Sequence, residues 1–242
     1  MTTGDVLSRS GGLVVLVDPG RTTPEDAADL TQRAADAGAA AMMLGTSYGG
    51  TERSTALVRA IKHAAPELPL IQFPATAAQL VAGTDAALFL SLVSGRNPQY
   101  LIEEHVRAVP FFERHPEIEV ISTAYCLVDG GRVTSVEFVS QTRPLPADKP
   151  ELVAAHVRAA MLIGMRAVYL DAGSGAERAI GSALVRAARN VTAAPLFIGG
   201  GLRDANAVRA ARDAGADYVV VGTLFEDTGS RVVRELALAA RA

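Results

Sequence analysis

Three glycine-rich turns in the C-terminal half of the sequence could together bind a phosphate. Residues 169–176 read Tyr-Leu-Asp-Ala-Gly-Ser-Gly-Ala, and comparable turns occur at residues 198–202 and at Gly222-Thr223. Glycines leave backbone N–H groups open to an oxyanion because no Cβ stands in the way. A helix expected to begin at Glu177 would add partial positive charge. One such turn is explained equally well by chain reversal, but three in succession predict a phosphate or diphosphate site.

Two oxygen-bearing side chains follow the first two apolar runs and could hold a divalent cation. Asp18 follows the run 13–17, and Ser47 follows the run 40–44. Side chains at the ends of neighbouring strands would face one another, and oxygen ligands suit Mg²⁺. This ion takes few protein groups and keeps water and substrate phosphates. The alternative for Asp18 is a structural role as an N-cap or turn residue before Pro19.

Asp171 and Tyr169 precede the first glycine turn, where an acid could take part in proton transfer. A carboxylate beside a bound phosphate ester can accept a proton from a substrate hydroxyl. The alternative is an ion pair inside the fold, with Arg203 or Arg96 as the partner.

Eight apolar runs alternate with helix-like segments and must position these residues. Continuous runs are typical of strands covered on both faces, as in parallel sheets. We expect strands at 13–17, 40–44, 69–73, 86–90, 119–128, 167–170, 195–198 and 218–221. Helices are expected at 24–37, 52–64, 98–114, 149–163, 177–189, 204–214 and 227–240. The alternation predicts one α/β domain over residues 1–242, a modified TIM (β/α)8 barrel, with an open doubly wound sheet as the alternative.

Three connections depart from a regular barrel. Residues 74–83 leave room for only a shortened or irregular third helix, and a shortened wall would leave a groove. Pro110 should kink or end the helix that contains it. The turn 129–132 followed by residues 133–139 predicts a β-hairpin extension.

Composition narrows the classes of function. Of the 242 residues, 49% are hydrophobic and 20% are charged, with a formal net charge of −3, which argues against nucleic acid as a partner. The single cysteine, Cys126, excludes an internal disulfide and is expected in the core. No signal peptide or membrane-spanning stretch is visible, which predicts a cytoplasmic protein. The histidines (His63, His105, His115 and His156) fall on predicted helices or in the loops after them and are expected to be solvated.

The order of motifs resembles the geranylgeranylglyceryl phosphate synthase family, which includes the bacterial heptaprenylglyceryl phosphate synthases. The resemblance covers residues 13–227, and its motifs are Asp18-Pro19, 45–47, Phe73-Pro74, 91–97, Tyr125, 169–175, 199–201 and Gly222-Thr223. It implies a barrel in which a looser segment replaces the third helix. It also implies transfer of a polyprenyl group from its diphosphate to the hydroxyl of sn-glycerol 1-phosphate.

The resemblance also implies roles for particular residues. Tyr125, Tyr169 and Asp171 would be catalytic, and Asp18 and Ser47 would serve the Mg²⁺ ion. The prenyl diphosphate loop would contain Ser94, Arg96 and Asn97. The phosphoglycerol would be held by Tyr169, Leu170, Asp171, Ala172, Gly173, Ser174, Gly175, Gly200, Gly201, Gly222 and Thr223. A homodimer is implied, with the fourth and fifth helices as contact surfaces, and so is transient membrane contact for the product.

Four departures from the family pattern lie around the expected acceptor and diphosphate. The family usually has Glu in place of Asp171, a glycine pair in place of Gly45-Thr46, a DPDK-like motif at 18–21 and glycine in place of Ala75. They keep open a second acceptor, 3-phosphoglycerate, used by the related moenomycin-type prenyltransferases, whose carboxylate Arg21 or Arg96 would fit. Two further alternatives are a phosphosugar isomerase or epimerase using Asp18 with Asp171, and a non-catalytic phosphate-binding barrel.

Overall fold

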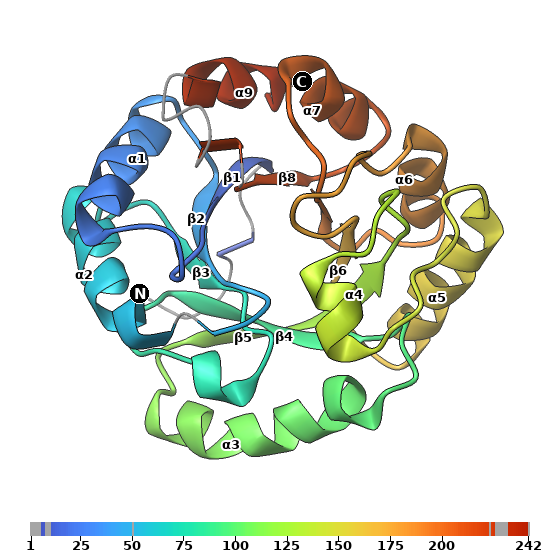
Figure 1. Cartoon of the computed structure of the whole chain (residues 1–242), viewed down its shortest axis with the longest axis horizontal. Coiled ribbons are helices and arrows are strands. Elements are labelled where there is room, and N and C mark those ends of the chain that lie inside the picture. The colour runs from blue at the N-terminus through green and yellow to red at the C-terminus, as the bar shows by residue number, and fades with distance from the viewer. Residues whose placement is uncertain (1–5, 8–10, 50, 223, 226–231, 242) are drawn as a thin grey trace.

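Eight parallel strands form a closed barrel surrounded by helices (Figure 1). The computed structural model describes residues 6–7, 11–49, 51–222, 224–225 and 232–241. Each strand pairs with the next in sequence, and β8 closes the barrel against β1. The strands are β1 (Gly12–Val17), β2 (Ala41–Leu44), β3 (Leu70–Gln72), β4 (Ala86–Leu92), β5 (Glu119–Leu127), β6 (Ala167–Asp171), β7 (Leu196–Gly199) and β8 (Tyr218–Val221). The predicted (β/α)8 barrel is therefore confirmed, and the open sheet is excluded.

Most helices form the outer ring, and α1 begins where the sequence provides start signals. At α1, the Thr23 hydroxyl accepts a hydrogen bond from the Asp26 N–H at 3.2 Å, and Pro24 occupies the first turn. The helices are α1 (Pro24–Asp36), α2 (Ser54–Ala64), α3 (Glu104–Arg114), α4 (Ser135–Ser140), α5 (Pro150–Leu162), α6 (Ser182–Arg189), α7 (Ala205–Asp213) and α9 (Val233–Ala239). The helix expected at 227–240 is described only from residue 232, and its predicted start lies outside the described residues.

Side-chain alternation along each strand divides the core into two layers. On β6, Val168 and Leu170 pack outward against the helices, whereas Tyr169 belongs to the cluster that fills the barrel. Stacked rings cross that interior: Tyr169 and Phe197 have centroids 5.9 Å apart, and Phe197 and Tyr218 have centroids 4.5 Å apart. Because period two places Asp171 on the same face as Tyr169, the barrel directs both side chains inward.

The third helix is missing, as the short connection predicted. Only a single 3₁₀ turn (η2, Ala77–Gln79) lies between β3 and β4. The next helix begins as a π-helical turn (η3, Gln99–Glu103) and continues as α3 through Pro110. Pro110 was expected to kink or end its helix. It does not end it, since α3 runs on to Arg114, and the kink stays a prediction.

The predicted β-hairpin over residues 133–139 is wrong, because residues 135–140 form the helix α4. Val136 and Val139 are three positions apart and both line the central cavity, which a short helix permits. The preceding Thr134 is buried, and a Cβ on Gly173 would collide with its side chain. In Figure 1, α4 lies inside the helical ring, beside β6. It therefore closes part of the barrel mouth instead of extending the sheet.

Helix α6 begins at Ser182, five residues later than expected. The N–H groups of Glu177 and Arg178 both donate to the Gly130 carbonyl at 3.0 Å, which holds this stretch outside a helix. The expectation that a helix start at Glu177 adds positive charge to the glycine turn is therefore wrong. In the described part of the chain, no helix is long and apolar enough to cross a membrane.

Candidate active site

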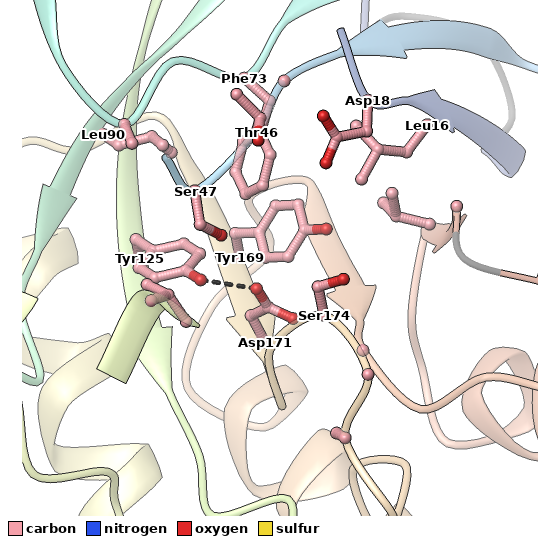
Figure 2. A pocket seen from close by; sticks show the side chains of 18 of the residues that line it. Leu16, Asp18, Thr46, Ser47, Phe73, Leu90, Tyr125, Tyr169, Asp171 and Ser174 are labelled. Carbon is pink, nitrogen blue, oxygen red and sulfur yellow. Dashed lines mark hydrogen bonds between the residues drawn. The ribbon is translucent and has the colours of Figure 1, made fainter. Parts of the chain in front are cut away.

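A cavity of about 320 Å³ lies at the C-terminal ends of the barrel strands. All eight strands or the segments that follow them contribute lining residues, so the closed barrel gathers distant parts of the sequence. Active sites of (β/α)8 barrels lie at this end of the strands. Figure 2 shows Asp18, Ser47, Asp171 and Ser174 around the ring of Tyr169. The cavity is therefore the candidate active site.

The three glycine turns meet at one side of this cavity. Ser174, Gly175, Gly200, Gly201 and Gly222 line it. Gly175, Gly200 and Gly201 have φ angles of +73°, +80° and +69°, which favour glycine. Within the described residues, the N–H groups of these three glycines have no protein partner. Such groups can bind the oxygens of a phosphate.

Not every residue of the predicted phosphate turn faces the cavity. Leu170 points outward into the helix-facing core, as its place in the strand alternation requires. The Ala172 N–H donates to the Gly199 carbonyl at 3.1 Å, and the Gly173 N–H donates to Asp171 Oδ1 at 2.8 Å. These two N–H groups are already used within the fold. Thr223 lies outside the described residues, so its predicted hydroxyl contact stays a prediction.

Asp171 forms a buried pair with Tyr125. The phenol O–H donates to Asp171 Oδ2 at 2.5 Å, and only 7% of the Asp171 surface is exposed. Burial raises the pKa of the Asp171 carboxyl, although the bonds from Tyr125 and the Gly173 N–H act to lower it. Burial and the adjacent carboxylate raise the pKa of Tyr125 well above its ordinary value. The carboxylate is therefore a stronger base than an exposed aspartate, beside a phenol that keeps its proton.

The alternative ion pair for Asp171 is not present among the described residues. Arg203 Nη2 donates to the Ala176 carbonyl at 2.8 Å, and Arg96 Nη1 donates to the Gly95 carbonyl at 2.6 Å.

Tyr169 is 2% exposed, and its ring stacks on Phe73 with centroids 4.7 Å apart. Tyr169 thus lines the same cavity as Asp171 and belongs to the aromatic stack inside the barrel.

Asp18 and Ser47 line the same cavity from the segments that follow β1 and β2. Asp18 Oδ1 accepts the Gly20 N–H at 2.8 Å, so the residue also makes the turn that was its alternative role. No group of three or more His, Cys, Asp or Glu side chains that could hold a metal occurs among the described residues. The donor set is one carboxylate and one hydroxyl, both hard oxygen ligands. These residues fit Mg²⁺, which fills its remaining positions with water and substrate oxygens.

The predicted diphosphate loop is not among the described residues that line the cavity. The Ser94 hydroxyl accepts the Leu127 N–H at 2.9 Å, and Asn97 Nδ2 donates to the Ser140 carbonyl at 3.2 Å. Arg96 bonds to carbonyl groups of its own loop. Ser94 thus fastens this loop to β5 and Asn97 fastens it to α4, whereas Arg96 bonds within the loop. Their direct contact with a diphosphate stays a prediction.

The cavity continues into an apolar slot beside the missing third helix. The side chains on this side include Ala75, Leu90, Tyr100 and Glu104. Sequence reasoning missed Tyr100 and Glu104 as lining residues, and it named Arg203 only as an ion-pair partner for Asp171. The available signal for the first two was that Tyr100 and Glu104 lie four positions apart, on one face of their helix.

The minor sequence candidates lie in structural positions. Cys126 is buried in the core as expected, and burial raises its pKa to about 12. All four histidines lie on helices or at their ends, but the expectation that they are solvated is wrong for His105. Its ring is half-buried against Phe89, with centroids 4.2 Å apart.

The fold and the cavity define an α/β barrel with a glycine-rich rim, a buried acid and an apolar slot. The chain belongs to the PcrB family, whose model matches residues 5–240. It is 40% identical over 230 residues to the geranylgeranylglyceryl phosphate synthase of Methanothrix thermoacetophila, covering 93% of this chain and 89% of that protein. The corresponding enzyme of Chitinophaga pinensis is 37% identical over 228 residues, covering 94% and 89%. The predicted family resemblance is therefore confirmed.

A solved structure agrees with this assignment. (S)-3-O-geranylgeranylglyceryl phosphate synthase from Thermoplasma acidophilum, in complex with its substrate sn-glycerol-1-phosphate, superimposes with a TM-score of 0.90. The two chains are 28% identical, and the match covers 99% of this chain and 98% of that chain.

Proposed function

We propose that this chain is a Mg²⁺-dependent prenyltransferase that joins a polyprenyl group to the hydroxyl of sn-glycerol 1-phosphate. One observation carries the proposal: the glycine turns, the Asp171–Tyr125 pair and the apolar slot share one cavity. The substrate named for the Thermoplasma acidophilum enzyme supports the choice of acceptor. Neither a phosphosugar isomerase nor an inert phosphate-binding barrel needs an apolar slot of this kind.

The acceptor would bind with its phosphate at the glycine turns and its reacting hydroxyl near Asp171. The N–H groups of Gly175, Gly200 and Gly201 would meet the phosphate oxygens. Carbon 1 of the prenyl group would form a bond to the hydroxyl oxygen as its bond to the diphosphate oxygen breaks. The hydroxyl proton would pass to the Asp171 carboxylate, whose raised pKa strengthens it as a base. Pyrophosphate would leave with the bonding electrons.

The donor would place its diphosphate near Asp18 and Ser47 and its hydrocarbon chain in the slot. A Mg²⁺ ion held there would stabilise the negative charge on the departing pyrophosphate. The side chains of Leu90 and Tyr100 would exclude water from the prenyl hydrocarbon.

A second acceptor, 3-phosphoglycerate, is supported by one feature of the cavity. Arg203 is the one cationic side chain among the described residues that line it. A carboxylate-bearing acceptor would need such a partner, because an unpaired charge is costly in a partly buried site. Arg21, an earlier candidate for this role, is not among those lining residues.

Incubation with labelled acceptors tests the proposal. Sn-glycerol 1-phosphate or 3-phosphoglycerate would be mixed with Mg²⁺ and prenyl diphosphates from farnesyl to heptaprenyl, followed by extraction into organic solvent. A labelled, extractable ether from sn-glycerol 1-phosphate is the expected result. Product from 3-phosphoglycerate alone would transfer the proposal to that acceptor, and no product from any pair would remove the prenyltransferase assignment.

We also propose that two copies associate through α3 and the turn before it. Ile102, Val106 and Val109 are 56%, 64% and 47% exposed and lie four and then three positions apart, on one helical face. Light scattering should then give twice the chain mass, and the mass of a single chain at working concentration would contradict the pairing. A cytoplasmic location and transient membrane contact stay predictions.

A further inference from the structure

The polypeptide that replaces the third helix has little packing of its own. This wall segment, residues 74–85, contains one 3₁₀ turn, and its buried side chains are Val81 and Thr84. A segment with few apolar contacts needs other interactions to keep one position. Since Ala75 lines the slot, the position of the wall segment sets the width of the slot at this point.

Side-chain hydrogen bonds supply that restraint. At the far end of the wall segment, Gln72 accepts the Val81 N–H at 2.8 Å and donates to the Val81 carbonyl at 2.8 Å. At the near end, Gln79 Oε1 accepts the Ala75 N–H at 2.7 Å. The middle of the wall segment is held from outside, by Glu104.

Glu104 belongs to α3 and bonds directly to the wall segment. Its Oε2 accepts the Ala77 N–H at 2.8 Å. Its Oε1 accepts bonds from Gln99 Nε2 at 3.1 Å and Arg107 Nη1 at 2.5 Å. The side chain is only 13% exposed and lines the cavity. A partly buried carboxylate with three donors is fixed in orientation, so it fixes Ala77 in turn.

The restraint continues to the other side of the cavity. Gln79 Nε2 donates to the Thr46 carbonyl at 3.2 Å, and Thr46 is followed by Ser47, the candidate Mg²⁺ ligand. A chain of hydrogen bonds therefore joins α3 to the wall segment and the wall segment to the loop that carries Ser47. The hydrocarbon end and the diphosphate end of the expected prenyl diphosphate would therefore each lie beside a segment that these hydrogen bonds hold.

We propose that Glu104 is a positioning residue for the prenyl diphosphate. It holds the wall segment at the slot through Ala77 and, through Gln79, holds the loop that carries Ser47. The acceptor side of the cavity, at the glycine turns, makes none of these contacts. This inference rests on the proposed function in one respect: the slot must be where the prenyl chain lies.

Three variants separate the hydrogen bond from the charge and from general effects on α3. Glu104→Ala removes the acceptor for the Ala77 N–H, whereas Glu104→Gln keeps an oxygen there. The glutamine also removes the charge and places an NH₂ group where Oε1 accepts from Gln99 and Arg107. Glu103→Ala is the matched control. Glu103 carries the same charge, contacts the same Arg107 at 3.4 Å and is 50% exposed, with no bond to the wall segment. All proteins would be compared at the same oligomeric state.

Steady-state kinetics should separate the two substrates. Glu104→Ala is expected to raise KM for the prenyl diphosphate at least about tenfold, the loss of one hydrogen bond to a charged group. The KM for the phosphoglycerol should change by less than about twofold, because the glycine turns are untouched. Glu104→Gln should recover most of the loss, and Glu103→Ala should behave as the unaltered enzyme. An equal rise in both KM values, or no recovery with glutamine, would overturn the proposal.

Hydrogen exchange and equilibrium binding test the same inference without turnover. In Glu104→Ala, the amides of residues 74–85 should exchange faster in the free protein, whereas Glu104→Gln and Glu103→Ala should leave them unchanged. Unchanged exchange in Glu104→Ala would refute the restraint itself. If the unaltered protein binds prenyl diphosphate without transferring it, the proposed function fails while weaker binding by Glu104→Ala still supports the positioning role. If the unaltered protein does not bind prenyl diphosphate, both fail.

Discussion

Gly200→Ala is the most direct perturbation of the phosphate-binding rim. Gly200 has a φ angle of +80°. An added Cβ would lie 2.7 Å from the Gly173 nitrogen, 2.8 Å from the Ala172 nitrogen and 2.8 Å from Asp171 Oδ1. These distances are too short for a Cβ, so the turn must shift. The substitution therefore strains the backbone and displaces the N–H groups that would meet the acceptor phosphate.

The two effects have different magnitudes and can be separated by a control. A residue with a Cβ in this left-handed region costs about 1–2 kcal/mol. Gly164→Ala carries that cost alone, since Gly164 has a φ of +90° and an added Cβ would meet nothing within 4 Å. One displaced hydrogen bond to a charged phosphate costs a further amount of about 1.5–3 kcal/mol in binding. The KM for the acceptor should therefore rise about 10- to 100-fold in Gly200→Ala.

Thermal unfolding and steady-state kinetics on both variants make the comparison. The melting temperature of Gly164→Ala should fall by about 2–8 °C, at 2–4 °C per kcal/mol for a chain of this size. Its KM values should not change. Gly200→Ala should lose at least as much stability and, in addition, its affinity for the phosphoglycerol. A folded Gly200→Ala protein with an unchanged acceptor KM would refute the glycine turns as the phosphate site.

Four further predictions concern buried groups. Tyr125→Phe leaves Asp171 Oδ2 without its donor, which should lower the free energy of unfolding by about 1.5–3 kcal/mol. Denaturant titration measures this difference, and an unchanged free energy of unfolding would contradict the hydrogen bond. Because burial raises the Asp171 pKa, kcat/KM should fall with decreasing pH at a midpoint above the ordinary value of about 3.9. A raised carboxyl pKa also means that the stability contribution of Asp171 is full below its pKa in the unfolded chain and is lost as pH rises through its pKa in the folded protein. Asp171→Asn should therefore be more stable than the unaltered protein at neutral pH, but inactive. A melting temperature below that of the unaltered protein would oppose this prediction. Cys126, whose pKa burial raises to about 12, should react with a thiol reagent only after unfolding, and rapid labelling of the folded protein would contradict its core position.

Much of the fold could be predicted because its signals are local. Continuous apolar runs located all eight strands, and Thr23 with Pro24 located the start of α1. The failures came where tertiary contacts decide. The residues of α4 alternate much as a strand would, and their helix forms against Gly173 and the cavity. The late start of α6 depends on bonds to the Gly130 carbonyl, which no local pattern reveals.

The candidate site divides in the same way. Glycine turns and strand-end acids carry their own signal, so Asp18, Asp171 and Gly200 could be found from their places in the chain. The partnership of Asp171 with Tyr125 spans 46 positions and follows from β5 and β6 lying side by side in the barrel. The contribution of Glu104 depends on how α3 sits against the wall segment, which sequence spacing does not determine.

The central claim is that this cavity couples prenyl transfer to release of pyrophosphate. A ³¹P NMR time course with Mg²⁺, a prenyl diphosphate and sn-glycerol 1-phosphate observes every phosphorus atom in that reaction. The diphosphate signals should disappear as one equivalent of inorganic pyrophosphate appears, and the acceptor signal should shift to a phosphomonoester of the ether product. Release of inorganic phosphate, or signals that do not change while both substrates are present, would contradict the account.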